Sequence, residues 1–80
     1  MSALTPKQAD LEAAALRIIL KAGGRMSTEA LMWRLIEHIV LRATETEARS
    51  AEAGLVLQGK AKYVYDGEGH LSVVVPALTS

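Results

Sequence analysis

The chain has 80 residues, of which half are hydrophobic and none is cysteine or phenylalanine, and its nine acidic and nine basic side chains give a formal net charge of zero. This length predicts a single domain, the lack of cysteine excludes disulfides and a cysteine-based zinc site, and the balanced charge supplies no long-range field for a polyanion. The first ten residues contain no signal-peptide core and the apolar stretch at residues 13–20 is too short to cross a bilayer, so we expect a cytoplasmic protein without a membrane partner.

The first expected element is a helix over residues 6–22. A proline suits its first position, and apolar side chains then recur at helical spacing, with Ile19 near the centre of the apolar stripe. Gly23 and Gly24 end the helix, because glycine adopts the left-handed closing conformation at little cost. A short extended link at residues 25–26 follows.

A second helix is expected over residues 28–41. The Ser-Thr pair at its start supplies a cap, and apolar side chains at helical spacing form a stripe centred on Leu35. No glycine, asparagine or proline marks its end. Two alternatives therefore stay open, a helix that stops near Ile36 and one that continues to about Arg42.

The apolar side of this second helix is wider than one small core needs. Trp33, Ile36, Val40 and Leu41 lie at its margins, and a contiguous exposed apolar surface marks an interface. We therefore expect a homodimer, because two-fold dimers are the commonest oligomers. The alternative is that a core without phenylalanine requires more aliphatic surface.

A capping box introduces the third helix. Thr44 and Glu47 have the spacing at which each side chain bonds the backbone of the other. The helix is expected over residues 44–53, with Gly54 closing it. The hydrophobic period then changes from that of a helix to that of a strand.

A β-hairpin is expected at the end of the chain. Runs rich in β-branched and aromatic residues at 60–65 and 70–75 flank an Asp-Gly turn at residues 66–69. A loop of these four residues would pair Val64 with Leu71.

Taken in order, these elements resemble the winged helix-turn-helix superfamily. The segments that carry the likeness are residues 16–24, 27–31, 52–56 and 66–69. The resemblance implies an α+β winged-helix fold, a three-helix bundle followed by a C-terminal β-hairpin wing, with an ordered core over about residues 5–76. It also implies a DNA-binding transcriptional regulator that acts as a dimer.

The DNA contacts implied by this resemblance fall on the third helix and on the wing. In such domains polar side chains of the third helix reach base edges, and basic side chains nearby hold phosphates. The candidates here are Arg42, Thr46, Arg49, Ser50, Lys60 and Lys62.

The third helix departs from that pattern, because it carries three carboxylates that we expect on its exposed side, Glu45, Glu47 and Glu52. Carboxylates repel phosphate. This departure favours an alternative function, a non-catalytic protein-interaction module that docks a partner through the apolar face of the second helix, as in an accessory protein of phage or plasmid type.

Neither catalysis nor metal binding is expected. The two histidines, His38 and His70, lie on different elements without ligand spacing. The sequence also has no nucleophile elbow and no phosphate-binding loop. We therefore expect no enzyme activity, no metal and no cofactor.

Overall fold

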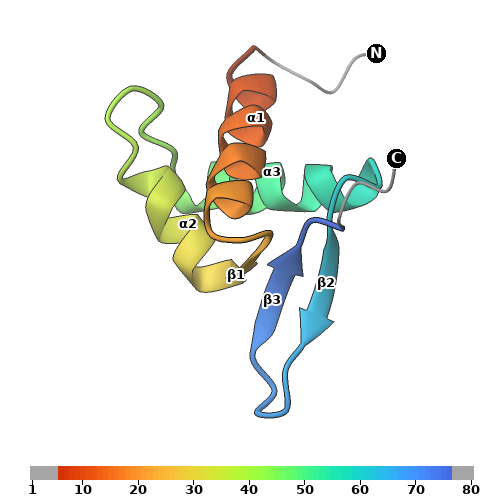
Figure 1. Cartoon of the computed structure of the whole chain (residues 1–80). Helices are drawn as coiled ribbons and strands as arrows, with labels where there is room; N and C mark the ends of the chain where they lie inside the picture. The colour runs from red at the N-terminus through yellow and green to blue at the C-terminus, as the bar shows by residue number, and fades with distance from the viewer. Residues whose placement is uncertain (1–5, 77–80) are drawn as a thin grey trace.

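The computed structural model describes residues 6–76, which form three helices and a three-stranded antiparallel sheet (Figure 1). The elements are α1 (Pro6–Lys21), β1 (Arg25–Ser27), α2 (Thr28–Ile36), α3 (Glu45–Leu57), β2 (Lys62–Tyr65) and β3 (Leu71–Val74). The expected α+β class is confirmed for these residues, whereas Thr5, at the edge of the expected core, lies outside them.

The core lies where α1, α2 and α3 meet, and β3 closes it on the side of the sheet (Figure 1). The largest fully buried side chains are all aliphatic: Leu11, Ile19, Leu31, Leu35, Leu55 and Val73. Ile19 and Leu35, which the helical spacing places at the centres of their stripes, are therefore core residues as expected. Buried alanines of α3, among them Ala48 and Ala51, allow the helices to approach closely.

Helix α2 ends at Ile36, so the expectation that it runs to residue 41 is wrong. In the loop that follows, the Nδ1 atom of His38 accepts hydrogen bonds from the backbone N–H groups of Val40 at 3.3 Å and Leu41 at 3.2 Å. Arg42 then adopts a left-handed φ of 45° and donates its N–H to the His38 carbonyl. These bonds give the backbone an alternative to the helical ladder.

Helix α3 begins as expected and ends later. The hydroxyl of Thr44 accepts a hydrogen bond from the Glu47 N–H at 3.1 Å, and the Glu47 carboxylate accepts one from the Thr44 N–H at 2.9 Å, which confirms the capping box. Gly54 does not close the helix. It lies inside α3, which continues to Leu57, and Gly59 supplies the left-handed residue with a φ of 76°.

The hairpin forms where expected, but its register differs by one residue. Val64 pairs with Ser72, one residue beyond the expected Leu71. The loop is longer than four residues because Gly69, with a φ of 83°, donates its N–H to the Asp66 carbonyl at 3.1 Å and adds one unpaired position before β3.

The segment expected only as an extended link is the edge strand β1. Met26 pairs with Val73, and the strand order is β1-β3-β2. The pairing continues beyond the strand, since the Val75 N–H donates to the Gly24 carbonyl at 2.8 Å. β1 thus fixes the hairpin beside the start of α2. None of the helices within residues 6–76 has the length and apolar character to cross a membrane.

Candidate functional site

All six residues predicted to contact DNA are exposed: Arg42, Thr46, Arg49, Ser50, Lys60 and Lys62. The three on α3 lie at helical spacing on one side of the helix, which we call the α3 stripe (Thr46, Arg49 and Ser50). The other side of α3 is buried through Ala48 and Leu55. The stripe therefore faces away from the core.

Basic residues flank α3 at its two ends. Arg42 precedes the helix, whereas Lys60 and Lys62 follow it. A helix of 13 residues is about 20 Å long. The structure thus brings the α3 stripe together on one surface and separates the flanking cations by about the length of the helix.

Arg49 is engaged in an ion pair with Glu45 of the preceding turn, with 3.2 Å between the arginine Nε and the carboxylate Oε2. Both side chains are well exposed, at 59% and 63%. Exposed pairs of this kind stabilise a protein by only about 0–1 kcal/mol. A guanine edge or a phosphate can therefore replace Glu45 as the partner of Arg49 at little cost.

The other two carboxylates of α3, Glu47 and Glu52, bind partners outside the α3 stripe. Glu47 caps the helix, and its carboxylate forms an ion pair with Lys7 at 3.0 Å. The hydrogen bonds that this carboxylate accepts from the Thr44 backbone and from Lys7 hold its pKa below the usual range. The expectation that Glu52 is exposed is wrong, because only 6% of this residue is accessible. Its Oε1 accepts a hydrogen bond from the Tyr63 hydroxyl at 3.1 Å. Glu45 is therefore the most exposed of the three carboxylates of α3.

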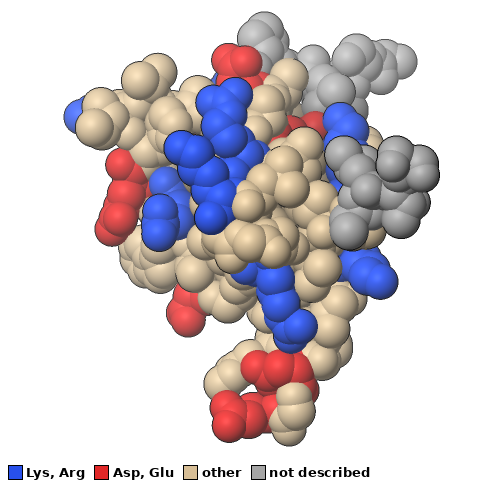
Figure 2. Space-filling view, viewed as in Figure 1, with Lys and Arg blue, Asp and Glu red and all other residues tan. Residues whose placement is uncertain are grey.

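The tip of the β2–β3 hairpin is acidic (Figure 2). The carboxylate of Asp66 accepts backbone hydrogen bonds from His70 at 2.9 Å and Glu68 at 2.8 Å, which hold its pKa below the usual range. Glu68 is exposed. A phosphate is repelled at this tip, so the cation that the hairpin offers is Lys62, at the other end of β2.

An apolar surface lies on α2 and the loop after it, and we call it the α2 patch (Trp33, Ile36, Ile39, Val40 and Leu41). Trp33 is 51% exposed and Val40 80%, while Ile36 and Leu41 are half-buried. Val40 and Leu41 belong to the loop, although the sequence pattern predicts them on the helix. Ile39, four residues after the buried Leu35, is 85% exposed because the helix ends before it.

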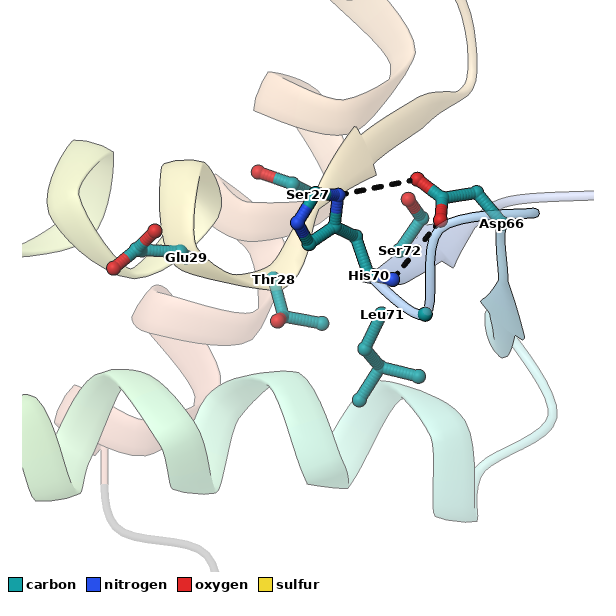
Figure 3. A pocket seen from close by; sticks show the side chains of 8 residues that line it. Ser27, Thr28, Glu29, Asp66, His70, Leu71 and Ser72 are labelled. Atoms are coloured by element: carbon teal, nitrogen blue, oxygen red, sulfur yellow. Dashed lines mark hydrogen bonds and ion pairs between the residues drawn. The ribbon is translucent and has the colours of Figure 1, made fainter.

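A shallow pocket of about 450 Å³ lies between the start of α2 and the hairpin loop (Figure 3). Thr28 and Glu29 line it from α2, and the imidazole of His70 turns toward Asp66 on the other side. The carboxylates of Glu29 and Asp66, which both line the pocket, disfavour the binding of an anion at the start of α2. No local sequence signal predicts this pocket, since its walls come from separate elements. Residues 6–76 contain no group of three or more His, Asp or Glu side chains suited to a metal ion.

The candidate surfaces among the described residues are therefore the α3 stripe with its flanking cations and the α2 patch. Helical spacing predicted the exposure of the α3 stripe correctly, and the α2 patch extends further over the loop than the sequence indicated. Comparisons of the chain with protein-family models, with curated proteins and with solved structures find no match.

Proposed function

We propose that the chain is a non-catalytic, winged-helix DNA-binding domain in which α3 is the recognition helix and the β2–β3 hairpin is the wing. The layout of three helices and an antiparallel hairpin is compatible with that fold. The observation that carries the proposal is the α3 stripe, exposed along one side of the helix and flanked by the exposed cations Arg42 and Lys60. Neither cation forms an ion pair with any residue in the described part of the chain.

The dimensions of this surface suit a major groove, which is about 12 Å wide. A helix of about 20 Å extends beyond the groove at both ends, so Arg42 and Lys60 approach the two phosphate ridges while the α3 stripe faces the bases. Arg49 is the natural reader of guanine, since its guanidinium bonds two acceptors at once. Contact from the wing comes from Lys62 and not from the acidic tip.

We infer further that the domain acts as a homodimer joined through the α2 patch. Apolar side chains as exposed as Trp33 and Val40 gain free energy when a second copy covers them. The exposed residues Arg34 and Glu37 border the patch on α2 with opposite charges. Antiparallel packing of two α2 helices about a two-fold axis places each Arg34 near Glu37 of the second copy. Such a dimer recognises two half-sites of a palindromic sequence.

The test is selection of duplexes from a random-sequence library at low salt, where electrostatic attraction is least screened. We expect the wild-type chain to retain a subset of duplexes with a shared sequence. A variant with Arg49→Lys keeps the charge but not the planar fork. This matched control should retain duplexes without enriching a sequence. Failure of the wild type to retain any duplex contradicts the proposed function.

The second candidate function is a protein-interaction module. The exposure of Ile39 and Val40 on the loop after α2 favours this function. The packing of one small core does not require two such exposed apolar side chains, and exposed apolar surface marks interfaces. The distinguishing experiment is capture from a host extract with and without nuclease. The decisive result is a protein, other than the chain itself, that is still captured after nuclease treatment. If the Val40→Ser variant no longer captures this protein, the α2 patch is its binding surface.

A further inference from the structure

A cluster of cations lies on a face that the proposed DNA-reading surface of α3 does not use. Figure 2 shows Lys and Arg side chains gathered where α1 and α2 lie side by side. The exposed cations of α1 beyond its first turn, β1 and α2 are Arg17, Lys21, Arg25 and Arg34, and we call them the basic face. None of the four forms a hydrogen bond or ion pair through its side chain with the described residues.

Carboxylates are scarce around this cluster. Arg17 and Lys21 are one helical turn apart, and no acidic residue lies one turn from either of them on α1. The one acidic neighbour by helical spacing is Glu37, one turn after Arg34. Arg17 and Lys21 are therefore not paired along α1, and cations within a Debye length of about 8–10 Å reinforce the positive potential of one another.

The formal net charge of zero conceals this surface. All nine Lys and Arg residues are exposed. Two of the nine carboxylates, Glu12 at 7% and Glu52 at 6% exposure, are buried. Two more, Asp66 and Glu68, lie in the loop between β2 and β3. Four of the nine carboxylates are thus buried or confined to this loop, whereas every Lys and Arg side chain is exposed.

We propose that the basic face binds the phosphate backbone of nucleic acid without reading its sequence, as a surface separate from the α3 stripe. Three of its four cations are arginines, whose planar guanidinium groups bond phosphate oxygens in pairs.

The two surfaces belong to different sides of the molecule. Arg17 and Lys21 lie on the side of α1 opposite Leu11 and Ile19, which are buried against the other elements. α1 crosses α3 (Figure 1), and buried residues of both helices belong to one core cluster, so the exposed side of α1 faces away from α3. The α3 stripe faces away from the core on its own helix. A chain docked on one duplex through α3 is therefore able to hold a second duplex by its basic face, a consequence that rests on the proposed function.

The test uses two charge variants of the full chain. The basic-face variant carries Arg17→Gln, Lys21→Gln and Arg25→Gln, and it keeps Arg34 because this residue borders the α2 patch. The matched α3-side variant carries Arg42→Gln, Lys60→Gln and Lys62→Gln, with the same change in net charge. Each protein is bound to an immobilised 20-base-pair duplex at low salt, and capture of a second, fluorescent duplex is measured. Thermal melts verify that both variants fold.

We expect the basic-face variant to bind the immobilised duplex within twofold of the wild type while its capture of the second duplex falls at least tenfold. Its slope of log affinity against log salt for the second duplex should fall by about 0.9 for each phosphate that the variant no longer neutralises. Undiminished capture by this variant overturns the inference and leaves the proposed function intact, because a dimer can then bridge duplexes through two α3 helices.

Three other outcomes are equally decisive. Wild-type binding to the immobilised duplex with no capture of the second also overturns the inference alone. If the α3-side variant binds normally and the basic-face variant does not bind at all, the basic face is the DNA surface and the proposed use of α3 fails. No binding by the wild type at low salt rejects both.

Discussion

Glu52 joins α3 to β2 through its hydrogen bond from the Tyr63 hydroxyl. Burial raises the pKa of this carboxyl above its ordinary value of 4.5, against the smaller lowering effects of the Tyr63 bond and the Arg49 charge. Burial and the neighbouring carboxylate also raise the pKa of Tyr63 to about 12. The pair therefore fixes the hairpin on the helix and favours the protonated form of both groups.

The raised pKa of Glu52 predicts how stability depends on pH. A group whose pKa is higher in the folded state contributes stability at low pH and loses it as the pH rises through the folded value. Glu52→Gln keeps an acceptor for Tyr63 but has no charge to desolvate, so we expect a higher Tm than the wild type at pH 7. The difference should disappear as the pH falls toward 4. A Tm below that of the wild type at pH 7 would show that the charged form is stabilised instead.

Arg49 and Lys62 are predicted to contribute to DNA binding in different ways. Removal of Arg49 from the α3 stripe by Arg49→Ala should cost about 1–3 kcal/mol on a selected duplex and relax the sequence preference. Lys62→Ala should weaken all sequences alike and lower the salt slope by about one. Fluorescence anisotropy on the selected duplex and a scrambled one, over a salt series, measures both. Equal weakening on both duplexes for Arg49→Ala would contradict base reading by α3.

At the scale of the elements, α1 and α3 meet at Gly54. The carboxylate of Glu12 accepts hydrogen bonds there from the side-chain amides of Gln8 at 2.9 Å and Gln58 at 2.7 Å. A Cβ placed on Gly54 would overlap the Glu12 carboxylate oxygen. A side chain at this position, where glycine is otherwise unfavourable in a helix, therefore requires the Glu12 carboxylate to move.

This contact predicts opposite effects of one substitution in two backgrounds. Gly54→Ala in the wild type should lower the free energy of unfolding by about 1–3 kcal/mol, since Glu12 must move from its partners. In a Glu12→Ala background, the same change should stabilise by up to about 1 kcal/mol, because alanine is the better helix former. Denaturant unfolding of the four proteins completes the cycle. A similar effect of Gly54→Ala in both backgrounds would mean that Glu12 is not the constraint.

The elements that the sequence predicted well are those fixed by local bonds. The capping box at Thr44 depends on residues three apart, and the exposed side of α3 follows from helical spacing. The end of α2 at Ile36 was one of two alternatives that the sequence left open, because it depends on the acceptor role of His38, which no turn residue announces. Strand β1 was missed because its partner β3 lies more than 40 residues later in the sequence.

The residues of the candidate site also divide into those whose position follows from local spacing and those whose position depends on other elements. Exposure of the α3 stripe was predictable, whereas burial of Glu52 depends on Tyr63 from another element. The basic face was not predicted either, because Arg17 and Arg34 belong to two helices, α1 and α2, whose packing the sequence does not give. Surfaces assembled from one helix can be read from spacing, and surfaces assembled from several cannot.

On the scale of the whole molecule, net charge is a poor guide to partners. The zero total by itself disfavours polyanions, yet four of the nine carboxylates are buried or lie at the hairpin tip while every Lys and Arg is exposed. The same zero total imposes no net repulsion between two copies of the chain. Both the proposed DNA binding and the proposed dimer therefore depend on where charges lie and not on their sum.

The two-fold dimer makes a charge-reversal prediction that apolar contact alone does not make. If each Arg34 lies near Glu37 of the second copy, Arg34→Glu should weaken the dimer by about 1–2 kcal/mol through two like-charge contacts, or roughly 5- to 30-fold in Kd. Glu37→Arg should weaken it similarly, and the double exchange should restore it. Light scattering over a micromolar concentration series measures each Kd. A double exchange no tighter than the single variants would reject the antiparallel α2 arrangement, and a monomeric wild type at high micromolar concentration would reject the dimer.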